Sequence, residues 1–378
     1  RRTSTVYDLA GRSIASVNPL GFRTTTVYDA AGQSRASVDP LGRRTSTVYD
    51  PAGRPVWRGG DIVAAFSAEC AAMTDLSLQS HLHTVRDFIR WSASRMTAEG
   101  VYFGHGTSNA IDEAAALVLH ALHLPPDLHA AYFDANLVSD EKRTILNLLD
   151  QRVGQRIPLP YLTQRAWFMG LPFFVDRRVL IPRSPLAELI ERQFAPWVQA
   201  EKVSRILDLC TGSGCIGIAC AHAFPEAEID LADISTEALD VAAINVADHG
   251  VDDRVELIRS DLFSALAGRR YGLILSNPPY VGHDEMTALP PEYAHEPRLA
   301  LESGEDGLDA PLAILKQARE FLEDDGVLVV EVGNAQWALR ERLPELPFLW
   351  LEFDRGGEGV FLLSAAELDE HADAIAAA

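Results

Sequence analysis

Residues 203–224 read VSRILDLCTGSGCIGIACAHAF and decide the fold. The apolar run at 203–209 predicts a buried strand, and CIGIACAHAF after the turn predicts an apolar helix. Small residues at the turn let the backbone approach a ligand closely, and the first N–H groups of a helix are free to bind a carboxylate or phosphate. We therefore expect a ligand site formed by Asp208, Cys210, Thr211, Gly212, Ser213 and Gly214.

Strands alternate with helices on the C-terminal side of this stretch. Runs rich in Val, Ile and Leu recur at 228–232, 255–258, 271–276 and 327–332. Helical patterns separate them, as at 236–249 and 308–322. This alternation predicts an α/β fold whose parallel sheet is covered on both faces. Two further runs, 348–353 and 359–363, flank a Gly-Gly turn and predict a closing antiparallel hairpin.

Two acidic residues follow the next strands of the predicted sheet. Asp233 ends the second strand, about twenty residues after the glycine turn, where a carboxylate can accept both hydroxyls of a ribose. Asp261 ends the third strand, where it can accept a hydrogen bond from an adenine amino group, and Leu262 can cover the adenine face. Each Asp could instead cap a helix, since Asp233 precedes the cap signal Ser235-Thr236. A ribose site suits NAD as well as S-adenosylmethionine.

The fourth strand ends in Asn277-Pro278-Pro279-Tyr280. A planar amide or aromatic amine is a poor nucleophile because its lone pair is delocalised. The Asn277 side-chain oxygen and the Pro278 carbonyl can accept its two N–H groups, and the prolines preorganise both acceptors. Tyr280 can stack on the flat substrate. The motif predicts methyl transfer to nitrogen, with Asn277 also beside the cofactor, although Asn-Pro-Pro also opens ordinary loops.

Residues 75–162 have a helical pattern. Apolar residues from Leu82 to Trp91 mark one helix face, Asp112 to Leu122 form a second helix, and a third begins with the cap signal Ser139-Asp140-Glu141. We expect a small substrate-recognition domain whose scattered histidines are ordinary surface or core residues. Residues 163–185 then predict a linking β-hairpin that turns near Asp176-Arg177.

The first sixty residues contain an internal repeat. Thr-Val-Tyr-Asp recurs every 21 residues, at 5–8, 26–29 and 47–50, with Pro-Leu-Gly turns at 18–21 and 39–42. The pattern predicts short strands in hairpins and resembles the tyrosine-aspartate repeats of Rhs and teneurin-like shells. Three repeats are too few to bury a core. Because Met73 could start a shorter protein, we expect 1–60 to be a fused remnant, poorly ordered and irrelevant to the chemistry; an appended binding segment is the alternative.

Composition and charge exclude several classes of protein. The 378 residues, 47% hydrophobic and 23% charged, are typical of a globular protein with two or three domains. No apolar run of membrane-spanning length and no signal-peptide pattern is present, so we expect no membrane role. Four cysteines without metal-site spacing predict buried or loop thiols and no metal. The formal net charge of the chain is −21; residues 1–58 carry +5, so the rest of the chain carries −26. An acidic body of this kind suits a basic protein partner better than DNA. The alternative is that the charge merely aids solubility.

Residues 76–365 resemble the protein-glutamine N5-methyltransferase family. The resemblance rests on the core motifs above and on the stretches 168–176, 179–183, 295–298 and 303–308. It implies a Rossmann-like class I methyltransferase domain at 186–366, with a seven-stranded, mostly parallel sheet, a tail at 367–378 and S-adenosylmethionine as cofactor. DNA adenine methyltransferases share Asn-Pro-Pro-Tyr but need a basic face. A dehydrogenase would explain the Gly-x-Gly-x-x-Gly spacing of Gly212, Gly214 and Gly217 and leave Asn277–Tyr280 unexplained.

Two stretches distinguish branches within this family. The release-factor branch typically reads Pro-Arg-Pro-Glu-Thr-Glu after the hairpin, whereas this chain reads IPRSPLAEL at 181–189. Together with YFGHGT at 102–107, that form resembles the branch that methylates the third large-subunit ribosomal protein. The implied partner is a basic ribosomal protein in the cytoplasm, modified before or during ribosome assembly. We expect the helical domain and loop 281–309 to build a peptide groove that Arg183 and Glu296 hold together, unless they form a plain salt bridge.

Overall fold

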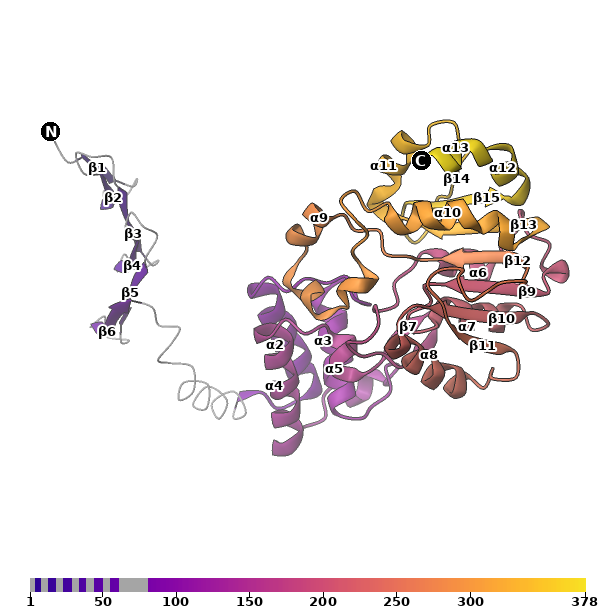
Figure 1. Cartoon of the computed structure of the whole chain (residues 1–378). Coiled ribbons are helices and arrows are strands. Elements are labelled where there is room, and N and C mark those ends of the chain that lie inside the picture. Colours follow the sequence, from indigo (N-terminus) through magenta and orange to yellow (C-terminus); the bar gives the residue numbers. More distant parts are fainter. Residues whose placement is uncertain are drawn as a thin grey trace. The chain divides into compact units, whose positions relative to one another are not determined.

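The structure is a computed structural model that describes residues 4–7, 13–17, 23–28, 34–38, 44–49, 55–60 and 81–378. The chain divides into two compact units, Arg1–Leu82 and His83–Ala378, each with its own internal contacts (Figure 1). Within these described ranges, no helix is long and apolar enough to cross a membrane. The same ranges contain no group of three His, Cys, Asp or Glu side chains that could hold a metal ion.

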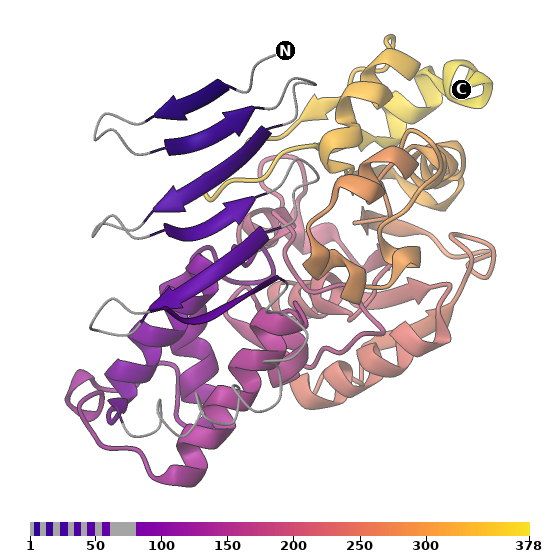
Figure 2. The ribbon, with the colours of Figure 1, turned by 90° about the vertical axis from the view of Figure 1, so that its left-hand side faces the viewer.

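The first unit is a six-stranded antiparallel sheet whose strands follow one another in chain order (Figure 2). The strands are β1 (Ser4–Tyr7), β2 (Ser13–Val17), β3 (Arg23–Tyr28), β4 (Ser34–Val38), β5 (Arg44–Tyr49) and β6 (Pro55–Gly60). The predicted short strands in hairpins are therefore confirmed, while the Pro-Leu-Gly turns lie outside the described residues. That this segment is poorly ordered and irrelevant to the chemistry stays a prediction.

The second unit begins with the three predicted helices, α2 (Val85–Ala98), α3 (Ala110–Ala121) and α4 (Ser139–Gly154). The 3-10 turn η1 (Ala130–Tyr132) and the short helix α5 (Leu159–Thr163) were not predicted. The side chains of Thr84 and Asp87 cap α2 reciprocally. Helix α3 begins two residues before the predicted Asp112, because the Asn109 side chain accepts the N–H groups of Ile111 and Asp112. The helices pack through buried apolar faces, and residues 75–80 of the predicted domain lie outside the described part.

The linking hairpin is present, but the prediction that it turns near Asp176-Arg177 is wrong. Strand β7 (Ala166–Phe168) pairs with β8 (Leu171–Phe173) across Met169-Gly170. Both turn residues have positive φ, 51° and 73°, as a two-residue type I′ turn requires. Asp176 forms a separate turn, in which its carboxylate accepts the N–H of Arg178 at 3.0 Å. The prediction thus assigned the turn to the polar pair Asp176-Arg177, whereas Met169-Gly170 forms it.

The α/β core is a seven-stranded sheet of order β11-β10-β9-β12-β13-β15-β14. Its strands are β9 (Arg205–Leu209), β10 (Glu228–Asp233), β11 (Val255–Arg259), β12 (Tyr271–Ser276), β13 (Leu322–Glu331), β14 (Leu349–Trp350) and β15 (Val360–Ser364). The first five are parallel, and β15 runs antiparallel to both neighbours, which confirms the mostly parallel sheet with a closing hairpin. The strand order reverses between β9 and β12, where open α/β sheets bind ligands at the carboxyl ends of their strands.

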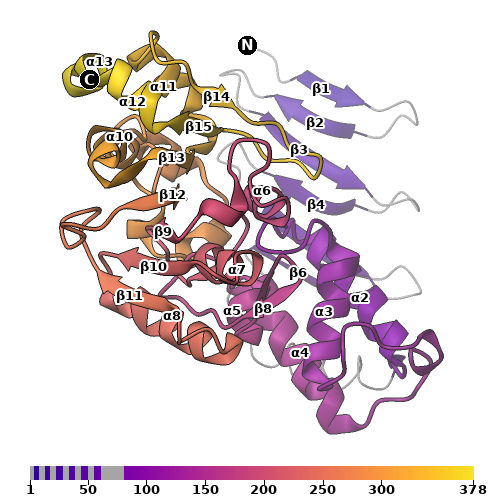
Figure 3. The same cartoon turned by 90° about the vertical axis from the view of Figure 1, so that its right-hand side faces the viewer.

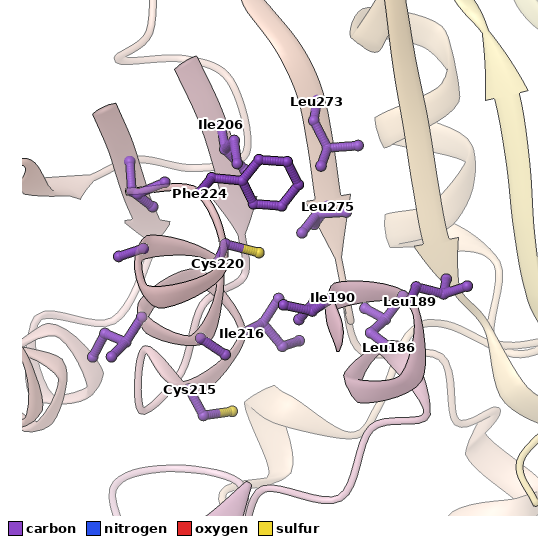
Figure 4. Packing of buried hydrophobic residues seen from close by; sticks show 14 of the residues in the cluster. Leu186, Leu189, Ile190, Ile206, Cys215, Ile216, Cys220, Phe224, Leu273 and Leu275 are labelled. Atoms are coloured by element: carbon purple, nitrogen blue, oxygen red, sulfur yellow. The ribbon is translucent and has the colours of Figure 1, made fainter. Parts of the chain in front are cut away.

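Helices cover both faces of this sheet. One face packs against α6 (Leu186–Glu191), α7 (Cys215–Ala223) and α8 (Thr236–His249) (Figure 3). The other packs against α10 (Asp309–Phe321), α11 (Gln336–Arg342), α12 (Ala365–Glu370) and α13 (Ala372–Ala377). Figure 4 shows Cys220 of α7 and Phe224, which follows α7, against Ile206, Leu273 and Leu275 of the central strands. The cysteines of α7 are therefore core residues, as expected for free buried thiols.

Short elements complete the second unit. Between β12 and α10 lie α9 (His283–Ala288), η3 (Pro291–His295) and η4 (Arg298–Ala300), and η2 (Ala200–Lys202) and η5 (Gly333–Ala335) precede β9 and α11. The last residues, expected as a tail, form α12 and α13. Leu368 and Ile375 are buried against the sheet, so this end of the chain is part of the core.

Candidate functional site

The glycine turn at 210–214, after β9, has a strained backbone that Asp208 supports through hydrogen bonds. Cys210 and Gly212 both have positive φ, 62° and 56°, and such strain in a non-glycine residue is typical of ligand sites. The fully buried Asp208 carboxylate accepts the Thr211 hydroxyl at 2.5 Å and the Gly217 N–H at 2.9 Å. Burial raises the pKa of Asp208 to about 7. Asp208 thus supports the turn and is not among the residues that line the adjoining cavity, and its predicted contact with the cofactor stays a prediction.

Gly214 also lies outside the cavity that its neighbours line. It is the N-cap of α7, with φ of 81°, and a Cβ there would come within 3.1–3.3 Å of Ile218, Leu231 and Ala242. The glycine therefore permits close packing between the turn and the core. This packing role leaves the predicted contact of Gly214 with the cofactor as a prediction.

Asp233 at the end of β10 lines the cavity and also accepts hydrogen bonds from the backbone. Its carboxylate accepts the N–H of Gly212 and the N–H of Ser235, both at 2.9 Å. Ser235 itself caps α8 through the N–H of Ala238. Asp233 therefore ties the glycine turn to the start of α8 while it lines the cavity, and each carboxylate oxygen retains a second lone pair. Burial raises its pKa, although these N–H groups oppose that shift.

A cavity of about 360 Å³ collects most of the predicted cofactor residues. Those that line it are Cys210, Thr211, Gly212, Ser213, Asp233, Asp261, Leu262 and Asn277, and Pro279, predicted as a substrate-binding residue, lines it as well. Leu262 has a positive φ of 44° and its carbonyl accepts the Ser260 hydroxyl at 2.5 Å, which fixes the turn after β11. Residues 178–184 and Ala310 also line the cavity, and the sequence analysis did not assign them to the cofactor site. The two carboxylates, the apolar Leu262 and the glycine turn together fit a nucleoside with a charged tail.

Asn277 also lines a second cavity of about 360 Å³ on the other side of the motif. Tyr280 lines this second cavity and not the first, whereas Pro279 lines only the first. Pro278 lines neither, so its side chain has no part in either wall. Arg183 is shared by both cavities. The motif thus stands between two chambers, with its amide at the boundary.

The walls of the second cavity come from distant parts of the chain. They include Tyr102 before α3, Val281, Leu289 and Tyr293 of the loop after β12, and Asn334 of η5. Asn334 donates to Glu285, another lining residue, at 3.1 Å. This cavity therefore brings Tyr102 together with the loop after β12, and the peptide groove between the helical domain and loop 281–309 stays a prediction. The volume of the cavity lies within the range of ordinary ligand pockets.

Tyr280 is held by a buried glutamate that the sequence analysis missed. Its hydroxyl donates to Glu331 at 3.1 Å, and the Ser184 hydroxyl donates to the other oxygen of Glu331 at 2.5 Å. Glu331 ends β13, inside the apolar run 327–332. An acid in a strand buried on both faces was the available signal, because such a charge needs partners.

Arg183 and Glu296 form the predicted ion pair across the edge of both cavities. Two guanidinium nitrogens donate to the two carboxylate oxygens at 2.6 and 2.7 Å, and the Ile181 N–H donates at 3.1 Å. The His105 ring nitrogen lies 3.5 Å from the same carboxylate. Burial would raise the pKa of Glu296, but Arg183 and His105 outweigh it and hold the pKa at about 2. The pair joins three of the distinctive stretches, 102–107, 181–189 and 295–298.

A second buried network attaches the helical domain to the same loop. Arg152 of α4 donates to Glu113 of α3, to Glu292 at 3.2 Å and to the Tyr102 carbonyl at 2.7 Å. Glu292 also accepts the Tyr102 N–H at 3.0 Å. Removing one partner of such a buried group leaves an uncompensated charge. The network therefore fixes Tyr102 at the wall of the second cavity.

The chain is similar to known methyltransferases. Residues 192–305 match the methyltransferase small domain model, and residues 28–56 match the RHS repeat model. The ribosomal protein uL3 glutamine methyltransferase of Francisella tularensis is 50% identical over 296 residues, covering 78% of this chain and 94% of the relative. The protein of the same name from Xanthomonas campestris is 51% identical over 290 residues, covering 77% and 94%. The chain has a methyltransferase domain on a class I Rossmann-like sheet. Its relatives are about half identical to it along nearly their full length. The chain therefore belongs to the ribosomal protein uL3 glutamine methyltransferase family.

Proposed function

We propose that this protein methylates the side-chain amide nitrogen of a glutamine in ribosomal protein uL3. The observation that carries the proposal is the position of Asn277, which lines both the cofactor cavity and the second cavity. A residue at that boundary can touch a methyl donor on one side and a glutamine amide on the other. The names of the two relatives supply the substrate.

S-adenosylmethionine, the cofactor of this family, supplies an electrophilic methyl group on a sulfonium. We assign Asp233 to the ribose hydroxyls, Asp261 to the adenine amino group and Leu262 to the adenine face; the support is that all three line the first cavity. The glycine turn at Gly212 approaches the remaining part of the cofactor. Each assignment follows from a carboxylate or apolar side chain at the carboxyl end of a strand.

The second cavity receives the glutamine. The Asn277 side-chain oxygen and the Pro278 carbonyl accept the two amide N–H groups, which directs the nitrogen lone pair toward the first cavity. Tyr280 packs against the flat amide and excludes water from it. Alignment of the two reactants is the main contribution, and can supply roughly 7–11 kcal/mol in favourable cases. The surplus amide proton leaves after the nitrogen has bonded to carbon, so a strong base is unnecessary.

The partner is proposed to be free uL3, modified before or during ribosome assembly in the cytoplasm. Beyond residue 58 the chain carries −26, which favours encounter with a basic ribosomal protein. The walls of the second cavity reach Tyr102 of the helical part and Tyr293 of the loop, so residues beside the target glutamine can be bound as well.

The test uses radiolabelled S-adenosylmethionine and three acceptors: purified uL3, a peptide release factor and adenine-containing DNA. We expect label on uL3, on a glutamine located by mass spectrometry, and faster labelling of free uL3 than of assembled large subunits. Label on the release factor alone would overturn the substrate assignment. Label on DNA would indicate an adenine methyltransferase, which shares the Asn-Pro-Pro-Tyr motif.

A further inference from the structure

Glu331 is a buried carboxylate next to Tyr280, and each of its oxygens accepts a hydrogen bond from a hydroxyl. Tyr280 donates to one oxygen at 3.1 Å and Ser184 to the other at 2.5 Å. Ser184 in turn accepts the N–H of Leu186 at 3.2 Å, so its hydroxyl is oriented. These contacts connect the end of β13 and the segment before α6 with the Asn277–Tyr280 motif. Glu331 itself lines neither cavity.

Two glycines bring backbone against Tyr280. A Cβ at Gly333 would lie 2.7 Å from Cε2 of the Tyr280 ring, and a Cβ at Gly307 would lie 2.2 Å from the Tyr280 carbonyl oxygen. Both glycines have positive φ, 45° and 80°, so their conformations are also unfavourable for other residues. The ring is thus packed directly on backbone, and its hydroxyl is tethered to Glu331. Its orientation has little freedom left.

We propose that Glu331 is a positioning residue, which fixes the Tyr280 ring for the target amide by accepting the Tyr280 and Ser184 hydroxyls together. This inference rests on the proposed methylation of a glutamine and deepens the account of that site. A hydrogen bond to an ionised group is the stronger kind, so the carboxylate form holds the ring best. The protonated acid carries a donor of its own and can accept both hydroxyls less well.

The surroundings of Glu331 bring its pKa close to neutral pH. Burial raises its pKa to about 7, while Ser184, Tyr280 and the Arg183 cation oppose that rise. Burial and the Glu331 charge raise the pKa of Tyr280 well above its usual range, so Tyr280 stays a donor. Arg183 stays charged and is paired with Glu296. Protonation of Glu331 is therefore the expected change at this cluster between pH 6 and 8.

The experiment measures single-turnover methylation of uL3 by the full chain saturated with S-adenosylmethionine, from pH 6 to 8.5. In the wild type we expect the rate to fall as pH drops through about 7, as Glu331 protonates. Glu331→Gln should lower the rate at pH 8 by about tenfold, in line with loss of a charge-assisted hydrogen bond. It should also remove the part of the pH dependence that Glu331 contributes, whereas Asp208, whose pKa is also about 7, still titrates in this variant. The dissociation constant for S-adenosylmethionine should change much less than the rate, because neither Glu331 nor Tyr280 lines the first cavity, and Ser184, which does, keeps an amide oxygen at position 331 as acceptor in Glu331→Gln.

Two further variants change the two hydroxyl donors to Glu331, Tyr280 and Ser184. Tyr280→Phe keeps the ring and removes the tether, so we expect a loss similar to that in Glu331→Gln, and no additional loss in the double variant. Ser184→Ala should give a smaller loss. Glu188→Gln is the matched control, because Glu188 is buried and accepts the N–H groups of Asp354 and Arg355 away from Tyr280. It should leave the rate and the pH profile as in the wild type.

The outcomes separate this inference from the proposed function. If the wild type methylates uL3 while Glu331→Gln and Tyr280→Phe keep its rate and pH profile, the positioning role is wrong and the function stands. Independent, multiplicative losses in the double variant would also overturn it. If Glu331→Gln does not fold, Tyr280→Phe decides, since it must be slower than the wild type and depend less on pH near 7. Lack of any uL3 methylation by the wild type would refute the function itself.

Discussion

Asn277 is a single residue that lines both cavities. It follows β12 at the point where the strand order reverses, and it lines both the cofactor cavity and the second cavity. The adjacent Ser276 hydroxyl donates to the Leu209 carbonyl at 2.7 Å, which locks the end of β12 to the end of β9. The amide is thereby held at a fixed height relative to the glycine turn. A preorganised acceptor of this kind adds little reorganisation cost to the reaction.

Asn277→Ala should lower the single-turnover rate by on the order of 10²-fold, because one of two acceptors for the target amide is lost. The dissociation constant for S-adenosylmethionine, measured by calorimetry, should change much less, since Asp233, Asp261 and the glycine turn are retained. Asn147→Ala, at an exposed position of α4, is the matched control and should behave as the wild type. Normal turnover by Asn277→Ala would contradict the mechanism.

Helix α7 and strand β10 approach closely at Gly217. A Cβ at this position would lie 2.1 Å from Leu231 Cδ2 and 3.0 Å from Asp208 Cβ. The Gly217 N–H also donates to Asp208, the carboxylate that supports the glycine turn. The third glycine of the Gly-x-Gly-x-x-Gly spacing is therefore needed for packing between helix and sheet. This explains why a dehydrogenase-like pattern occurs at a methyltransferase site.

Gly217→Ala should reduce the free energy of unfolding by about 1–3 kcal/mol, the usual cost of overpacking a core. It should also weaken cofactor binding, since Asp208 and the turn must move. Gly154→Ala is the matched control, because a Cβ there meets nothing within 4 Å at the end of α4. That change should be neutral or stabilise by up to about 1 kcal/mol. Urea unfolding followed by circular dichroism compares them, and equal midpoints for the two variants would disprove the packing argument.

Among the elements, those with a strong local signal were predicted well. Helix α8 begins and ends at the expected residues, because Ser235 caps it and Gly250, with φ of 61°, ends it. The hairpin before the sheet was predicted with the wrong turn, since Met169 is an unusual residue at positive φ and hides the turn signal of Gly170. Sequence patterns therefore located elements better than the exact turns between short strands.

At the scale of the whole molecule, the site lies within one of the two units. Both cavities and the buried core clusters are formed by residues of His83–Ala378. The repeat sheet Arg1–Leu82 has its own strand pairing and matches a different family model at residues 28–56. Its strands carry none of the residues proposed for methyl transfer.

Deletion of residues 1–72 should leave the rate of uL3 methylation and the unfolding midpoint of the second unit unchanged, because the core and both cavities remain complete. Methylation assays over a range of uL3 concentrations and thermal unfolding of both proteins provide the measurement. A markedly higher KM for uL3 with an unchanged kcat would show instead that the repeats are an appended binding segment. Loss of cofactor binding would contradict the independence of the second unit.

The sequence by itself determined the α/β class, the glycine turn, Asp233, Asp261 and the Asn277–Tyr280 motif. Each of these depends on local patterns, and parallel strands bring their carboxyl ends to one edge whatever the details of packing. Only the tertiary structure decided that Asp208 supports the turn from behind and that Glu331 and Ser184 hold Tyr280. These contacts join residues up to 147 positions apart, and no local preference specifies such pairs. Burial of polar groups in the assembled core imposes them, because each must find a partner there.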